Sequence, residues 1–281
     1  MLKPFVIAVV LVVFMSASFL SAAPAARAER ILKHLPAAVQ QTIRAQLEDG
    51  KLSAIEKNDD NGDTSYDVEM VSHGKTRSFT VGSDGELLDV EVFLEELPPA
   101  VQQAIKTKAG SAAPDEIDKS DGETGTSYSV DITSNGKSRT FTVDATGKLM
   151  DEQVWMTELP GVLQKAVQKE IGAGTPEEIT RSFDSGETLY DVDVAGGGKT
   201  QTLTFDSNGA LLSRQEETPL SALPDAAQKQ IQTLSAGGKL VAISKVTEQN
   251  VISFDVDVRQ SGKLKSYTVD PDGKLLVPGA N

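Results

Sequence analysis

The stretch that decides the fold runs from Leu97 to Glu158: it opens with LPPAVQQAI (97–105) and continues through TSYSVDITSNGKSRTFTVDATGKLMDEQ (126–153). The chain has this order of features four times, with Leu-Pro pairs beginning at Leu35, Leu97, Leu159 and Leu223, at intervals of 62, 62 and 64 residues. Each pair is followed at matching positions by an aromatic (Tyr66, Tyr128, Tyr190, Phe254), a Gly-Lys pair (Gly74, Gly136, Gly198, Gly262) and a second glycine (Gly85, Gly147, Gly209, Gly273). A fixed period of this length predicts a tandem array of small structural units.

Each copy begins with a predicted helix. In the third copy, Leu159, Leu163, Val167 and Ile171 recur every four residues and form one apolar stripe. The proline after each leucine is predicted at the first helical position, where its missing N–H has no intrahelical partner. Glycines near 50, 110 and 172 are predicted to end the helices.

After each helix the apolar period changes to two. Tyr128, Val130 and Ile132 alternate with polar residues, and Asn135-Gly136 has the composition of a tight hairpin turn. Further strands are predicted around Ile117, through Phe141 and Val143, and from Leu149 onward. The sequence thus predicts an α+β fold of four tandem repeats of about 62 residues, each one helix packed on a four-stranded antiparallel sheet.

The predicted division of the chain is a signal peptide at 1–28 followed by repeats at 29–96, 97–158, 159–222 and 223–281. A unit of this size buries only about 60% of the surface that its unfolded chain exposes, so it is marginally stable alone. We therefore expect the repeats to pack on one another within the chain, and the uncovered edge strands are candidates for pairing.

The amino terminus predicts export. Lys3 precedes the apolar run FVIAVVLVVFM (5–15), and Ala26-Arg27-Ala28 fits a cleavage site before Glu29. A retained membrane anchor is the alternative, but the run is shorter than the ~20 residues that a spanning helix needs. We expect a periplasmic or secreted protein that has no membrane attachment after cleavage.

Charge and cysteine content narrow the function classes. Removal of Lys3 and Arg27 with the signal peptide lowers the formal net charge from −14 to −16, which disfavours nucleic acid and anionic lipid as partners. The chain contains no cysteine, which excludes disulfides, thiolate metal sites and a lipidated cysteine.

Taken together, the pattern LPxAVQxAI, YxVxI, a Gly-Lys turn, FTVD and a glycine-containing turn resembles the PepSY-like domain, which is related in fold to the secreted β-lactamase-inhibitor protein. The resemblance covers residues 31–278, with departures at Phe205, at 196–198 and at 225–227. It implies a non-catalytic helix-plus-sheet module of the cell envelope or exterior that binds or inhibits other proteins. It carries over no catalytic position.

Candidate binding residues lie on the outward positions of the strands. Outward threonines recur at Thr80, Thr142, Thr204 and Thr268, beside carboxylates at Glu69, Asp131, Asp193 and Asp257. Two interpretations are open: a solvated strand face, since threonine suits exposed strands, or a recurring binding face. Trp155 is not repeated, and it is either buried between units or an exposed anchor for a partner.

No catalytic or metal site is predicted, and no cofactor. Strand carboxylates two residues apart lie ~7 Å apart on one face, but they lack the enclosed cleft that two-carboxylate hydrolysis needs. Asp59, Asn61 and Asp63 have the spacing of a calcium loop, yet Thr64 replaces the required glycine and Met70 the bidentate glutamate.

The sequence therefore predicts an exported, non-enzymatic binding protein that presents sheet faces to an unknown protein of the cell envelope or exterior, with inhibition as one form of that role. The alternative is sequestration of a small ligand or divalent cation by the repeated acidic residues.

Overall fold

A computed structural model describes residues 22–60, 63–122, 125–172, 174–184, 186–196, 199–260 and 263–277. Its strands form one antiparallel sheet of sixteen strands, in which the spatial order is the order along the chain. The first eight strands are β1 (Lys51–Asp60), β2 (Asp63–Ser72), β3 (Lys75–Gly82), β4 (Leu87–Glu91), β5 (Pro114–Gly122), β6 (Gly125–Ser134), β7 (Lys137–Asp144) and β8 (Leu149–Gln153). The last eight are β9 (Thr175–Asp184), β10 (Glu187–Gly196), β11 (Lys199–Asp206), β12 (Leu211–Glu217), β13 (Lys239–Glu248), β14 (Val251–Gln260), β15 (Lys263–Val269) and β16 (Leu275–Val277).

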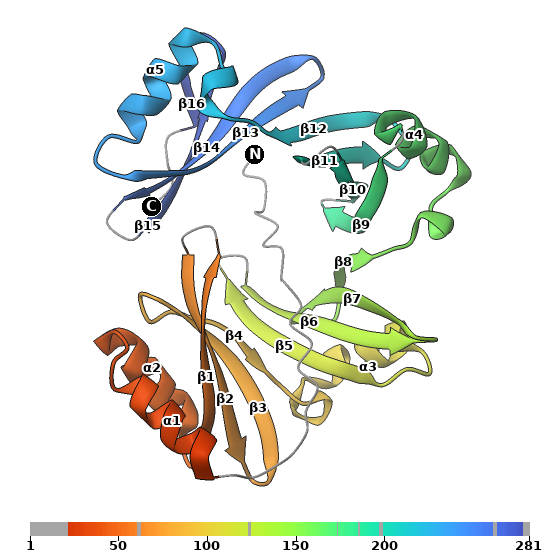
Figure 1. Ribbon diagram of the computed structural model, residues 1–281. Coiled ribbons are helices and arrows are strands. Elements are labelled where there is room, and N and C mark those ends of the chain that lie inside the picture. The colour runs from red at the N-terminus through yellow and green to blue at the C-terminus, as the bar shows by residue number, and fades with distance from the viewer. Residues whose placement is uncertain are drawn as a thin grey trace.

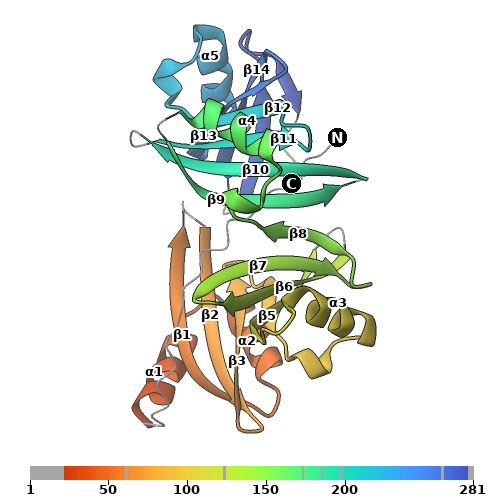
Figure 2. The same ribbon diagram turned by 90° about the vertical axis from the view of Figure 1, so that its right-hand side faces the viewer.

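The helices lie on the outer side of this sheet. Two precede β1, and one lies before each of β5, β9 and β13, each of these three preceded by a short 3-10 turn. The sheet curves so that the helices face outward and the opposite face lines the inside of the curve (Figures 1 and 2). The helices are α1 (Ala22–Leu32), α2 (Ala37–Leu47), α3 (Pro99–Ala109), α4 (Gly161–Ile171) and α5 (Asp225–Leu234), and the 3-10 turns are η1 (Leu94–Glu96), η2 (Met156–Glu158) and η3 (Leu220–Ala222).

The predicted fold of four repeats, each with one helix on its own four-stranded sheet, is wrong. One sheet continues through the whole described chain because β4 pairs with β5, β8 with β9 and β12 with β13. At the first of these junctions Val90 is paired with Lys119 and Glu91 with Asp118. An edge strand has unpaired N–H and C=O groups, and here the neighbouring edge in the same chain satisfies them. The apolar period of a segment identifies it as a helix or a strand. It does not identify which strand pairs with each edge of the sheet.

Four hydrophobic clusters follow one another between the helices and the sheet. The second along the chain joins Val101 and Ile105 of α3 to Val130 of β6 and Phe141 of β7, all at most 1% exposed. Each such side chain contributes about 1.5–3 kcal/mol when fully buried. The core predicted for this stretch is confirmed: Leu97, Val101, Ile105, Ile117, Tyr128, Val130, Phe141 and Val143 are buried, and Leu149 is half-buried against them.

The Leu-Pro pairs fix the start of each helix in a way that differs from the prediction. Pro160 is the N-cap of α4, with φ −52° and ψ 142°, and not its first helical residue. The Gln164 side chain donates from Nε2 to the Leu159 carbonyl at 2.8 Å. The equivalent glutamines Gln40, Gln102 and Gln228 do the same for Leu35, Leu97 and Leu223.

The second glycine of each copy lets a turn approach a helix. Gly147 has φ +85°, and a Cβ there would lie 2.8 Å from the Ala100 carbonyl oxygen at the start of α3. Gly85 and Gly273 approach the backbone of Ala38 and Ala226 in the same way, whereas Gly209 lies less tightly against Ala166 and the Val162 carbonyl. Only glycine allows both this backbone conformation and this approach.

At the amino terminus, α1 spans the predicted cleavage position before Glu29. Ala28 is 1% exposed and packs with Leu32 into the first hydrophobic cluster. The apolar run 5–15 lies outside the described residues, so the export signal stays a prediction. Within the part of the chain that the structure describes, no helix is long and apolar enough to cross a membrane.

Candidate binding face

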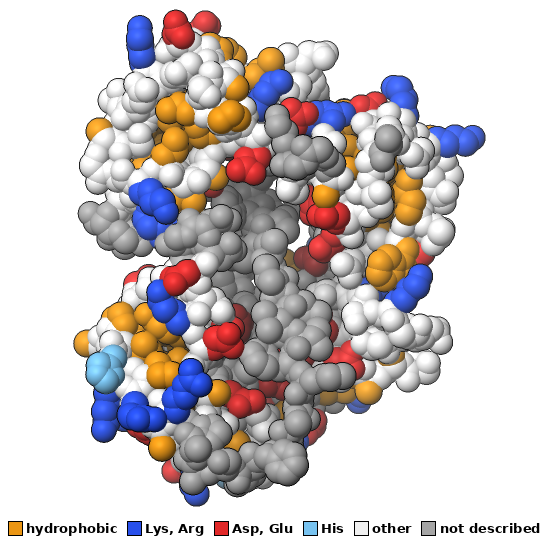
Figure 3. Space-filling model, in the orientation of Figure 1, with side chains coloured by type: hydrophobic (Ala, Val, Ile, Leu, Met, Phe, Trp, Pro, Cys, Tyr) orange, Lys and Arg blue, Asp and Glu red, His pale blue; other side chains and the backbone are white. Residues whose placement is uncertain are grey.

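The two faces of the sheet differ in charge. We call the face turned away from the helices the open face; because side chains alternate along a strand, it carries the strand positions between the buried core residues. Register places hydroxyl or carboxyl side chains on it in almost every strand. Figure 3 shows acidic side chains along the inside of the curve. The carboxylates and threonines of the open face include Asp67, Thr80, Asp89, Glu91, Glu116, Asp118, Asp131, Thr142, Asp151, Asp191, Asp193, Thr204, Asp255, Asp257 and Thr268.

The cations of the central strands lie on the helix side. Between β2 and β12, the strand lysines and arginines with described side chains share this side: Lys75, Arg77, Lys119, Lys137, Arg139, Arg181 and Arg214. Their contacts agree, since Lys75 lies 4.1 Å from the Phe93 ring centroid and Arg77 binds Glu96 at 2.7 Å. Lys51, Lys239 and Arg259 face the open side, but they belong to β1, β13 and β14, outside this range.

Hydroxyl groups hold many of the open-face carboxylates in place. Thr204 donates to Asp191 at 2.6 Å, and Thr202 donates to Asp193 at 2.6 Å. The same pairs recur as Thr80 with Asp67, Thr140 with Asp131, Thr268 with Asp255 and Ser266 with Asp257. A carboxylate that accepts one hydroxyl still has lone pairs for another donor.

The residues predicted as a binding face are therefore mostly on one face, but in different pairs. Thr80, Thr142, Thr204 and Thr268 are all half-buried on the open face, as are Asp131, Asp193 and Asp257. Each recurring threonine except Thr142 bonds the aspartate two residues before the predicted one. Glu69 is exposed and accepts a hydrogen bond from Ser53 of β1 at 3.0 Å.

Trp155 lies apart from these residues, on the helix side. Lys137 lies 5.1 Å from its ring centroid, and its backbone N–H donates to Glu158 Oε2 at 2.8 Å. The ring is partly exposed. Trp155 therefore cannot contact a partner that docks on the open face.

The densest group of carboxylates lies where β4, β5 and β6 meet, and we call it the junction cluster: Asp89, Glu91, Glu116, Asp118 and Asp131. Register places Glu91 directly opposite Asp118, and Glu116 opposite Asp131. Like charges at directly opposed positions repel. Ser78 offsets part of this, donating to Glu91 from its backbone N–H at 2.9 Å and from its hydroxyl at 3.1 Å.

The rise in carboxyl pKa is largest at the centre of the junction cluster. Burial, together with the charges of Glu116, Asp89, Glu91 and Asp131, raises the pKa of Asp118 to about 8. Burial also raises the pKa values of five other open-face groups, with repulsion from neighbouring carboxylates adding to it: Asp89, Glu116, Asp131, Asp151 and Glu178. Both effects disfavour the charged form of a carboxyl group.

On the helix side, a buried carboxylate is paired with two cations. Glu152 of β8 is 1% exposed and is bound by Lys108 of α3 and Arg181 of β9. Burial alone would raise the pKa of Glu152, but the hydrogen bonds and charges of the two cations hold it below its usual value. This ion triad joins α3 to β9 across the β8–β9 junction.

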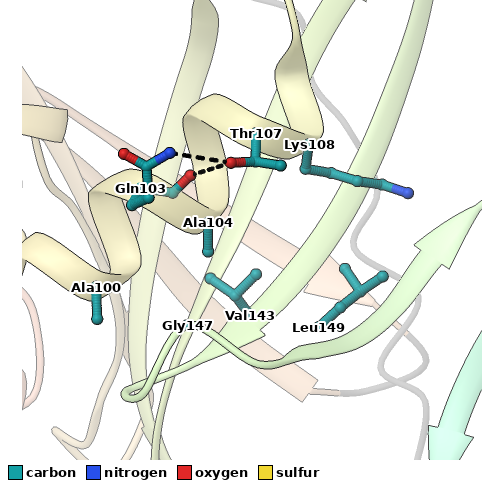
Figure 4. A pocket seen from close by; sticks show the side chains of 8 residues that line it. All are labelled: Ala100, Gln103, Ala104, Thr107, Lys108, Val143, Gly147 and Leu149. Carbon is teal, nitrogen blue, oxygen red and sulfur yellow. Dashed lines mark hydrogen bonds between the residues drawn. The ribbon is translucent and has the colours of Figure 1, made fainter.

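Neither a metal site nor an enclosed catalytic cleft is found in the described part of the chain. No group of three or more His, Asp or Glu side chains there could hold a metal ion. The predicted calcium-like spacing includes Asn61, which lies outside the described residues. A pocket of about 500 Å³ lies between α3 and the sheet on the helix side, lined by Ala100, Gln103, Ala104, Thr107, Lys108, Val143, Gly147 and Leu149 (Figure 4). The cation in this lining, Lys108, already binds Glu152.

The sequence reasoning missed Asp89, Glu91, Glu116, Asp118 and Asp151 as part of the face. The outward direction of Asp118 could be predicted, because the sequence predicts that Ile117 points inward and its neighbours therefore outward. What could not be foreseen was that β4 pairs with β5, which brings carboxylates from two predicted repeats together.

The class of protein is one in which helices cover one face of an antiparallel sheet and the other face is polar and uncovered. The family model described as "Putative beta-lactamase-inhibitor-like, PepSY-like" matches residues 31–89, 65–151 and 188–276. The chain belongs to this family. The second match begins in β2 and ends in β8, so it crosses the predicted repeat boundary at 96–97, and the domain boundaries stay a prediction.

Solved structures resemble parts of this chain. A BLIP-like protein from Bacteroides fragilis NCTC 9343 is 22% identical, covers 43% of this chain and 84% of its own, and has a TM-score of 0.36. A DUF2874 family protein from Bacteroides uniformis ATCC 8492 is 17% identical over 42% of this chain and 86% of its own, with a TM-score of 0.37. The same four values hold for a structure from Bacteroides eggerthii DSM 20697 described as "putative periplasmic proteins". No curated protein matches the chain.

Proposed function

We propose that this protein is exported and binds a protein partner across the open face, without catalysing a reaction. The observation that carries the proposal is the open face itself. The described helices all lie on one side of the sheet (Figure 1), and the other side presents hydroxyl and carboxyl groups that are hydrogen-bonded to one another. A sheet face that is curved and rigidly hydrogen-bonded loses little entropy when it binds.

The open face is large enough for a stable complex. Eight residues of strand span about 26 Å, and four strands about 19 Å, which gives roughly 500 Å² per four strands. Eight adjacent strands therefore offer roughly twice that area. A standard interface needs about 800 Å² from each partner.

Two substitutions of matched size test the use of this face. Thr142→Trp places a large ring on the open face at β7, whereas Gln232→Trp places the same ring on the exposed side of α5. Affinity capture from the cell envelope and culture medium, with each variant as bait, should recover a protein that T142W loses and Q232W retains. If every recovered protein binds both variants equally, the open face is not the binding surface.

An inhibitory role is one form of this function, in keeping with the family's description. It requires that the captured partner be an enzyme whose activity falls when the protein binds. Activity of the purified partner, titrated with wild type and with T142W, separates inhibition from simple binding.

The alternative is sequestration of a small ligand or divalent cation. The junction cluster favours it by charge, but its side chains are not arranged as ligands to one ion in the described residues. Calorimetric titration with calcium tests it: stoichiometric binding that the double variant Glu91→Gln and Asp118→Asn abolishes would support sequestration over protein binding.

A further inference from the structure

We propose that the segment bound on the open face is an extended polypeptide with lysine or arginine at every third or fourth residue, anchored over the junction cluster. This inference rests on the proposed function, because it names the chemistry of the partner for the same face.

Charge segregation is the first reason. On β2 to β12, the described lysine and arginine side chains lie on the helix side, whereas carboxylates occupy the open face. Such a face attracts cations over a range of about one Debye length and repels anionic partners. Among the described side chains of these strands, the open face has no counter-charge of its own.

The junction cluster is the second reason. Asp118 faces Glu91 on β4 and Ser129 on β6, with Glu116 beside it on its own strand. Lys119 points to the opposite side of the sheet, towards Tyr128. The carboxylates therefore repel one another, and a partner's ammonium or guanidinium group would relieve this repulsion.

The spacing of aspartates across the sheet determines the spacing of cations expected in the bound segment. Asp131 on β6, Asp151 on β8 and Asp191 on β10 recur on every second strand of the open face. Register displaces Asp151 by two residues along the strands, because Asp131 lies opposite Thr140 of β7 and Asp151 opposite Thr142. Two strand separations of about 9.5 Å therefore become about 12 Å between successive aspartates, and three to four residues of extended chain span about 10–13 Å. An extended segment that crosses the strands can thus place one cation over each of these aspartates.

Proton exchange provides a specific signature of such binding. Burial and the surrounding carboxylates raise the pKa of Asp118 to about 8, so the group is largely protonated at pH 7 in the free protein. A cation placed beside it favours the charged form and lowers the pKa. Binding near pH 7.5 should therefore release protons.

The test uses the purified full chain and synthetic peptides with six Lys-Ser-Ser repeats, six Glu-Ser-Ser repeats, or the same six lysines in one block. Isothermal titration calorimetry at pH 7.5 in two buffers of different ionisation heat gives affinity and proton release together. We expect the Lys-Ser-Ser peptide to bind at least tenfold more tightly than the blocked peptide, with proton release, and the glutamate peptide not to bind.

A matched pair of double variants locates the contact. Glu91→Gln with Asp118→Asn removes two carboxyl groups from the junction cluster, and Glu95→Gln with Asp121→Asn removes two exposed carboxyl groups on the helix side. The first should weaken binding at least tenfold and abolish proton release, whereas the second should change affinity less than twofold. Asp151→Asn, outside the cluster, is a further single variant that should weaken binding by a smaller factor.

Several results would overturn the inference. Equal binding of the two lysine peptides would remove the spacing argument, and equal affinity of the two double variants would remove the junction cluster as anchor. Competition by spermidine at the same stoichiometry would assign the face to a small polycation. If the partner captured through the open face binds the cluster variant as well as wild type, the cationic partner is refuted while the proposed function stands.

Discussion

Asp118→Asn should make the protein more stable at alkaline pH and flatten the dependence of its stability on pH. The folded-state pKa of Asp118 is raised to about 8 from its ordinary value of 3.8 by burial and by four neighbouring carboxylates. Between these two values the folded state holds a proton that the unfolded state releases. The stabilisation is therefore complete below the unfolded pKa and is lost as the pH rises through the folded pKa.

The expected magnitude follows from the same two pKa values. One pKa unit corresponds to about 1.4 kcal/mol, and the proton is held with decreasing occupancy between pH 6 and pH 8, so the upper limit for the loss over this interval is about 2 kcal/mol. Relaxation of the neighbours and water penetration reduce it to roughly 1 kcal/mol. Asparagine resembles the protonated acid in shape and has no charge, so it removes this loss.

Urea denaturation at pH 6 and pH 8 measures the effect as a change in the free energy of unfolding. Wild type should lose about 1 kcal/mol between the two pH values, and D118N should lose markedly less. Asp121→Asn is the control, because hydrogen bonds from Lys119 and Thr126 lower the pKa of this exposed carboxyl and keep it charged throughout. The reasoning is refuted if wild type is equally stable at both pH values, or if D118N and D121N have the same slope.

Gly147→Ala should destabilise the fold by about 2 kcal/mol or more, since the new Cβ would clash with a helix carbonyl, whereas Gly136→Ala, also at positive φ but in open space, should lose only about 1 kcal/mol in thermal unfolding. Glu152→Gln removes the buried carboxylate that two partly exposed cations share and should cost about 1.5–3 kcal/mol through the loss of charged hydrogen bonds, compared with at most about 1 kcal/mol for Glu158→Gln at an exposed ion pair; equal losses would show that the triad is not structural. Gln164→Ala should cost about 1 kcal/mol by freeing a helix-start carbonyl, measured by denaturation.

Local structure was predictable from the sequence because its causes are local. The apolar stripe of Leu159, Leu163 and Val167, which has a period of four residues, predicts a helix, and the helix is buried on that face. The alternation of Tyr128 and Val130 with polar residues predicts a strand, and its inward side is the predicted one. Hydrophobic period fixes which face of an element is buried, whatever that element packs against.

The pairing of the edges was not predictable in the same way. An edge strand has the same backbone donors and acceptors whether it meets solvent, another molecule or the next part of its own chain. The side chains at the β4–β5 junction do not predict the pairing, because Val90 lies opposite the charged Lys119 and Glu91 lies opposite the like-charged Asp118. Backbone hydrogen bonds therefore decide this contact against the side-chain electrostatics.

The same contact explains why comparison of the four copies pointed to residues of the open face but not to the junction cluster. That comparison favours positions shared by all copies, such as Thr80 and Thr268, and these threonines bond carboxylates on adjacent strands of their own copy. The position of Asp118 is not shared in this way, because the two later copies have the uncharged residues Thr180 and Ser244 there.

The first copy has an acid at the same position, Glu56, but it is exposed on β1, which is the edge of the described sheet and has no strand beyond it to oppose the charge. Asp118 differs because β4 lies beside it and places Glu91 directly opposite. A carboxyl group at a place where its charged form destabilises the fold is explained by a partner more readily than by packing. For this reason the junction cluster, and not the recurring threonines, anchors the proposed contact.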